Sequence, residues 1–154
     1  MSPPRIRNPY KEAPASVAAM MQLEATFDAS GLDPLLIELV KLRASQINGC
    51  AACLQMHVSA ARKHGEGEMR LHMLPGWRES TLYSERERAA LGWTEALTRI
   101  ADTHAPDADY APFAAAFSEA EQVQVTLIIG AINAWNRVGV GFRVPPVETR
   151  AAQA

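Results

Sequence analysis

The sequence is poor in cysteine, with only two among 154 residues, and it has no long uninterrupted apolar run. Its most apolar segment, residues 123–138, is broken by amide side chains and an arginine, so we expect it to be too short and too polar to span a bilayer. The net charge of −2 and the pI near 6.1 give no basis for binding nucleic acid or an anionic membrane. We therefore expect neither a membrane nor a nucleic acid as partner.

Motifs for common cofactors are missing as well. The sequence has no G-x-G-x-x-G loop for a dinucleotide and no C-x-x-C-H for covalent haem, so we assign no cofactor and no cofactor-binding residue. Residues 1–14 contain four prolines and three cations but no apolar run, which is unlike a secretory signal. We therefore expect a cytoplasmic protein, and in that compartment a C-x-x-C pair is more often redox-active or metal-binding than structural.

The sequence does contain residues that are typical of helix starts. Asp33 followed by Pro34 predicts one helix start, and capping boxes predict two more, at Ser84 with Glu87 and at Ser118 with Glu121. No strand pattern is present, so the predicted fold class is all-α, with about six or seven helices. The expected helices begin near residues 14, 34, 50, 67, 84, 106 and 118. The expected divisions are an extended arm at 1–13, a helical domain at 14–143 and a tail at 144–154.

Both cysteines lie in one stretch, residues 38–57, as a C-x-x-C pair. Asn48-Gly49 is expected to begin a helix that places Cys50 and Cys53 in its first turn. At 100° per residue, both cysteines and His57 fall within an arc of about 60° on one face. Because the positive end of a helix favours a thiolate over a thiol, this spacing indicates reactive sulfurs, which we expect to face a partly buried cleft.

The residues alone leave three interpretations of the pair open: redox chemistry, a metal site, or a structural pair. A closed zinc site needs four ligands, and the pair with His57 supplies three. His64 lies roughly 10 Å further along the same helix, too far to complete the shell. His64, His72 and His104 are assigned to the surface or to structure. Redox chemistry is favoured, and we assign no metal ligand.

The order of residues around the pair resembles a known family. Glu38, then Arg43-Ala44-Ser45-Gln46-Ile47-Asn48-Gly49-Cys50, then Cys53 and His57, is similar to the core of the alkylhydroperoxidase D-like (AhpD-like) branch of the carboxymuconolactone decarboxylase superfamily. Residues 84–91 and 132–137 are similar to later segments of that branch. The resemblance implies a helical AhpD-like bundle that forms trimers or hexamers. It also implies a hydroperoxide substrate and a thioredoxin-like or lipoyl-bearing dithiol as electron donor.

The leading prediction is a thiol-dependent peroxidase whose pair cycles through sulfenic acid and disulfide. One alternative keeps the pair but reduces protein disulfides or serves as a redox adaptor. A weaker alternative is a non-redox enzyme of the decarboxylase type, against which the cysteine pair argues. The family's better-studied peroxidases have a histidine just before the second cysteine, where this chain has Ala52. That difference bears on the rate and on the natural substrate.

Two arguments disagree on which sulfur attacks. The helix dipole alone favours Cys50, which lies nearest the helix start. The resemblance assigns attack to Cys53 and resolution to Cys50. His57 is four residues from Cys53, the separation at which helical side chains meet, and seven from Cys50. We therefore predict four catalytic residues, with Cys53 as nucleophile, Cys50 resolving, His57 as base and Glu38 tuning the proton relay. For a further set of polar residues, a role in orienting the cleft and a polar surface role stay open: Arg43, Asn48, Asn133, Asn136 and Arg137.

Overall fold

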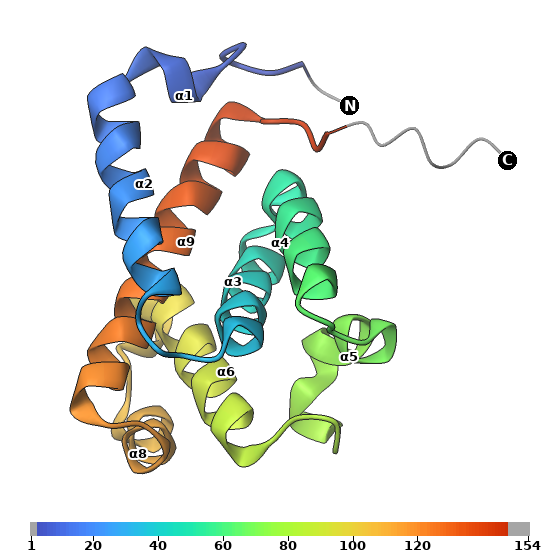
Figure 1. Ribbon diagram of the computed structural model, residues 1–154, viewed down its shortest axis with the longest axis vertical. Coiled ribbons are helices and arrows are strands. Elements are labelled where there is room, and N and C mark those ends of the chain that lie inside the picture. The colour runs from blue at the N-terminus through green and yellow to red at the C-terminus, as the bar shows by residue number, and fades with distance from the viewer. Residues whose placement is uncertain (1–2, 148–154) are drawn as a thin grey trace, which may run out of the picture.

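Helix α3 (Pro34–Asn48) is the element on which the other helices pack. It lies against α4 (Ala51–Lys63), α6 (Glu85–Thr98) and α9 (Glu119–Phe142), and Figure 1 shows it between α4 on one side and α9 on the other. Most side chains along α3 are buried, including Leu39 and Leu42. A helix that packs on several sides needs such a broad apolar surface.

The computed structural model describes residues 3–147, and within them every regular element is a helix. The remaining α-helices are α1 (Pro9–Glu12), α2 (Pro14–Asp28), α5 (Glu68–Met73), α7 (Ile100–Thr103) and α8 (Asp107–Ala116), and the 3-10 helix η1 (Leu74–Glu79) follows α5. The all-α prediction is confirmed. The expected count of six or seven was too low for the described residues, chiefly because α1 and α7 are single turns of four residues that carry no periodic signal.

Three of the predicted helix starts are confirmed in detail. Both capping boxes form: Ser84 with Glu87 begins α6, and Ser118 with Glu121 begins α9. The Asp33 side chain accepts a hydrogen bond of 2.9 Å from the Leu35 N–H at the start of α3. Each cap satisfies backbone N–H groups that have no partner inside the helix, which is why these starts are readable from sequence.

Two expectations at the chain's turns need correction. The N-terminal arm is not extended throughout, because residues 9–12 form α1, whose first position tolerates Pro9. Asn48 does not cap the cysteine helix; it is the last residue of α3, and Gly49 closes that helix with a φ of 69°. Cys50 is the N-cap of α4 instead. Residues 1–2 and 148–154 lie outside the described residues, and the division into arm, domain and tail stays a prediction.

By length and composition α9 could cross a membrane, since it has 24 residues and a mean hydropathy of 1.2 in its most apolar window. On these two criteria the expectation of a segment too short and too polar is wrong. The packing accounts for the apolar residues in another way, because α9 contacts α2, α3, α4, α6 and α8. Such contacts are typical of the core helix of a bundle.

Buried apolar side chains form three clusters. The first joins α2, α3, α6, α8 and α9 around Phe27, Phe113 and Ile128, and the second lies beneath α4, α5 and η1 around Leu74. The third is small and consists of Ala44, Cys50, Cys53 and Ile132, with Trp135 packed against it. The cysteine pair therefore lies where α3, α4 and α9 meet.

One carboxylate links α3, η1 and α6. Glu95 accepts hydrogen bonds from Arg43 Nε and Trp77 Nε1, both at 2.8 Å, and from Arg78 Nη2 at 3.0 Å. Burial raises the pKa of the Glu95 carboxyl, but these three donors outweigh it and the net pKa is lowered. The ionised carboxylate is therefore stabilised by the fold.

Replacing Glu95 with alanine is expected to lower the free energy of unfolding by about 1–3 kcal/mol at neutral pH, because the Arg43 and Trp77 donors lose their acceptor. A carboxyl whose pKa is lowered on folding stabilises the protein above its unfolded pKa, and this contribution is lost as the pH falls through the folded pKa. Urea titrations should thus show a difference in the free energy of unfolding between wild type and Glu95→Ala that becomes smaller at acidic pH. The exposed Glu79→Ala serves as control, and a gap that is constant with pH contradicts the assignment.

Candidate active site

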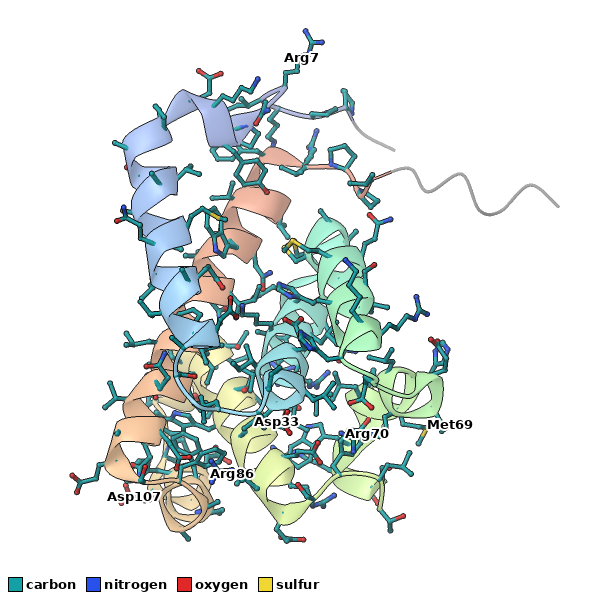
Figure 2. The ribbon with its side chains drawn as sticks, viewed as in Figure 1. Arg7, Asp33, Met69, Arg70, Arg86 and Asp107 are labelled. Atoms are coloured by element: carbon teal, nitrogen blue, oxygen red, sulfur yellow. A yellow bond between two sulfur atoms is a disulfide. The ribbon has the colours of Figure 1, made fainter. Side chains whose placement is uncertain are left out.

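The cysteine pair sits at the start of α4. Cys50 is the N-cap residue, and its Sγ accepts a hydrogen bond of 3.4 Å from the Cys53 N–H. The two residues are joined by a disulfide, with their Cα atoms 5.3 Å apart, and the bond is visible in yellow beside the upper end of α4 in Figure 2. A sulfur in the N-cap position takes the place of the usual oxygen acceptor, where backbone N–H groups also favour negative charge on it.

Both sulfurs are shielded from bulk water, since Cys50 is 1% exposed and Cys53 is 5% exposed. Beside them is a cavity of about 330 Å³. Its lining comes from the start of α4 and from the end of α9 with the segment that follows: Gly49, Cys50, Ala51, Gly139, Val140, Arg143, Val144, Pro145 and Pro146. The expected cleft is therefore present for Cys50, whereas Cys53 does not line it.

His57 and Glu38 form a pair one helical turn beyond Cys53. His57 Nδ1 lies 2.9 Å from Glu38 Oε2, and both side chains are largely buried. An ionised carboxylate can only accept a hydrogen bond, so Nδ1 carries the proton and Nε2 of the neutral ring is left as the basic nitrogen. The structure thus brings Glu38 on α3 next to His57 on α4, which is the contact that the predicted proton relay needs.

A chain of side-chain amides, buried at Asn133 and Asn136, ties α9 to α3. The Asn48 amide donates to Asn133 Oδ1 and to Asn136 Oδ1, both at 2.9 Å, and the Asn136 amide donates to Ser45 Oγ at 3.0 Å. Asn136 is 1% exposed and Asn133 is also buried, so the polar surface role is wrong for both. Each amide is paired, as buried polar groups require, and the network fixes where α9 lies relative to the cysteines.

Gly139 is the residue at this site that sequence reasoning missed. A Cβ atom placed there would lie 2.7 Å from Cys50 Sγ and 3.5 Å from Cys53 Sγ. Gly141, two residues later, has nothing within 4 Å of the same position. The sequence V-G-V-G-F gives no signal that separates the two glycines, because only the packing of α9 on α4 brings one of them against the sulfurs.

The remaining histidines lie away from the pair. His64, His72 and His104 are all exposed, in agreement with the surface or structural role expected for them. Within residues 3–147, no group of three or more His, Cys, Asp or Glu side chains is arranged to hold a metal ion.

Comparisons with known proteins identify the family and two close relatives of this chain. A model of the carboxymuconolactone decarboxylase family matches residues 12–96. The chain is 40% identical over 133 residues to the uncharacterized protein YdfG of Bacillus subtilis (strain 168), covering 86% of this chain and 90% of YdfG. A protein of unknown function from Agrobacterium tumefaciens, named as a candidate antioxidant defence protein AhpD, has a crystal structure that matches with a TM-score of 0.91 and 47% identity, over 96% of this chain and 100% of that chain.

The fold is also shared with more distant proteins. The crystal structure of the debrominase Bmp8 matches with a TM-score of 0.80 over 89% of this chain and 74% of that chain, at 20% sequence identity. At that identity the likeness concerns the fold alone. Because one fold carries different chemistry, the residues of the site and not the fold determine the reaction.

Proposed function

This chain belongs to the carboxymuconolactone decarboxylase family, in its AhpD-like branch, and from that premise we propose that it is a thiol-dependent peroxidase of the alkylhydroperoxidase type. The observation that carries the proposal is the combination of a Cys50–Cys53 pair at a helix start with a His57–Glu38 pair one turn away. A nucleophile, a resolving thiol and an oriented base are the parts that such a reaction needs.

The proposed reaction starts with both cysteines reduced. The Cys53 thiolate attacks one oxygen of the hydroperoxide, the O–O bond breaks, and the leaving alkoxide takes a proton to become an alcohol. Cys53 is then a sulfenic acid. The Cys50 sulfur attacks the Cys53 sulfur and releases water, which gives the disulfide that the structure contains.

His57 is proposed as the base that forms the Cys53 thiolate. Its position four residues after Cys53 on α4 places the two side chains on one face, one turn apart. The Glu38 carboxylate holds the proton on His57 Nδ1 and so leaves Nε2 free to take one. The same carboxylate stabilises the imidazolium once it forms.

Reduction of the disulfide is proposed to begin at Cys50. Cys50 lines the cavity and Cys53 does not, so a donor thiolate that enters there meets the Cys50 sulfur. Attack on Cys50 releases Cys53 as the thiolate, next to the helix start and one turn from His57, where it is ready for the next peroxide. The donor is a dithiol of the thioredoxin-like or lipoyl-bearing class, and cytoplasm is the compartment in which such donors stay reduced.

Protein disulfide reduction without peroxide is the second candidate function. The cavity fits this function too, because a donor thiol can reach Cys50 of the oxidised pair whether a peroxide or a protein disulfide oxidised it. Non-redox decarboxylase-type chemistry would give the disulfide no role.

The test compares oxidants with one dithiol donor in excess. Reduced protein is first titrated for thiols before and after one equivalent of an organic hydroperoxide, and two thiols should be lost per chain. Turnover with hydroperoxide should then exceed turnover with a protein disulfide. Loss of thiols with faster disulfide turnover would favour the second function, and no loss of thiols would contradict the peroxidase.

We also propose that the protein is a homo-oligomer, a trimer or hexamer as the family suggests. Along one side of α9, Val123 is 61% exposed and Leu127 is 45% exposed, and Gly130 one turn later is also exposed. Such a stripe is unfavourable in water unless another surface covers it.

Light scattering at micromolar concentration should return a mass of several times 16.8 kDa. The double variant Val123→Glu, Leu127→Glu should shift the mass toward one chain, because it places charges in the proposed contact. The matched control is Met69→Glu, an exposed apolar residue on α5 away from α9. A single-chain mass for the unmodified protein would overturn the proposal.

A further inference from the structure

Gly139 of α9 packs directly against the disulfide. A Cβ there would be 2.7 Å from Cys50 Sγ, inside the distance that real carbon and sulfur atoms tolerate. It would also be 3.5 Å from Cys53 Sγ, an ordinary contact. The space that any side chain at position 139 would need is thus already taken by the Cys50 sulfur of the oxidised pair.

We expect this contact to be tighter in the oxidised state than in the reduced state. In the disulfide the Cys50 sulfur is held by its covalent partner, so it cannot rotate away from α9. After reduction the Cys50 side chain can move to another rotamer about its Cα–Cβ bond. A side chain at position 139 is therefore expected to cost more free energy in the disulfide form than in the dithiol form.

Helix α9 cannot readily move aside to relieve such a clash. One turn before Gly139, Asn136 is bonded to Asn48 and Ser45 of α3. At the other end, the Val144 N–H donates to the Gly139 carbonyl at 2.8 Å, and Arg5 donates from its backbone to Phe142 O at 3.0 Å. Before Gly139, α9 is therefore fixed to α3, and after it the end of α9 is closed by Val144 and joined to the N-terminal segment by Arg5.

We propose that Gly139 is a positioning residue for the redox pair: its missing side chain leaves the space that Cys50 Sγ occupies in the disulfide, and so sets the balance between disulfide and dithiol. The inference deepens the proposed function, since a peroxidase cycle passes through both forms. The reaction that it concerns is exchange with a dithiol: the protein disulfide and reduced dithiothreitol become the protein dithiol and oxidised dithiothreitol, with two electrons and two protons transferred.

The test is the redox equilibrium of Gly139→Ala in mixtures of reduced and oxidised dithiothreitol, with the protein thiols counted by alkylation. Gly141→Ala is the matched control, because it makes the same change in the same helix with nothing within 4 Å. Alanine favours a helix over glycine at both positions, so that effect cancels in the comparison. We expect Gly139→Ala to shift the equilibrium constant at least about tenfold toward the dithiol, which makes the reduction potential of the pair about 30 mV less negative. Gly141→Ala should have the wild-type equilibrium constant.

An equilibrium constant for Gly139→Ala equal to that of Gly141→Ala would overturn the inference. Thermal unfolding of both redox forms provides a second measurement: Gly139→Ala should lower the melting temperature of the oxidised protein and leave that of the reduced protein at or above the wild-type value. An equal decrease in melting temperature in both redox forms would also overturn the inference, because it would show that Gly139 has only a structural role. Neither measurement uses peroxide, so a failure of the peroxidase proposal would leave their outcome interpretable.

A third readout applies within the peroxidase cycle. If alanine at 139 hinders the disulfide, the step in which Cys50 attacks the Cys53 sulfenic acid should slow. With one equivalent of hydroperoxide, Gly139→Ala should give more sulfenic acid trapped by a dimedone-type reagent than wild type, although Cys50 is present. Labelling no greater than in Gly141→Ala would contradict this step.

Discussion

Serine at position 53 is expected to abolish peroxide reduction, by a factor of about a thousand or more, while serine at position 50 leaves the first chemical step intact. Removal of a nucleophile generally takes an enzyme to its residual or uncatalysed rate. Cys53 is assigned that role because His57 lies one helical turn from it and because attack by a donor at Cys50 returns Cys53 as the thiolate.

The two variants are matched, since each removes one sulfur and both lose the disulfide. After one equivalent of hydroperoxide, Cys50→Ser should carry a sulfenic acid on Cys53 that a dimedone-type reagent traps. This variant should not turn over with a thioredoxin-like dithiol as electron donor. Cys53→Ser should give no label. If the label is found only in Cys53→Ser, the two roles are reversed, and if neither variant is labelled, the peroxidase proposal is wrong.

Loss of His57 is expected to have the second-largest effect. A positioned general base contributes about 10²–10⁴-fold to a rate, so His57→Ala should slow the first attack on peroxide by a factor in that range. Single-turnover kinetics of the reduced protein, followed by the loss of Cys53 thiol, measure this step directly. His64→Ala is the control, because His64 ends the same helix and is exposed; it should react at the wild-type rate.

Glu38→Gln separates a role in proton transfer from a role in packing. The glutamine has nearly the same shape, but its amide can donate to His57 Nδ1 and so move the ring proton to Nε2, where it blocks the base. The variant should therefore fold with wild-type stability and still lose activity, with a pH–rate profile displaced from that of the wild type. A wild-type rate in either His57→Ala or Glu38→Gln would remove the proton relay from the mechanism.

The helix starts that carry a local capping signal could be predicted from the sequence. The caps at Asp33, Ser84 and Ser118 were readable because the side chain that satisfies the free N–H groups lies within three residues of them. The turn at Asn48-Gly49 was assigned to the wrong helix because the same two residue types suit a helix start and a helix end: Gly49 takes a φ of 69° and closes α3, and Cys50 caps α4 instead. The partners of the Asn48 amide, Asn133 and Asn136, lie 85 and 88 residues away and are not visible in a local window.

The sequence by itself determined the all-α class, the family resemblance and the register of Cys50, Cys53 and His57, because these depend on spacing along one stretch of chain. Only the tertiary structure decided that Glu38 meets His57 across two helices, that the cavity reaches Cys50 and that Gly139 rather than Gly141 touches the sulfurs. Helical periodicity fixes the direction of a side chain from its own helix. Which atoms it meets depends on how close another helix packs, and here buried amides between α3 and α9 set that distance.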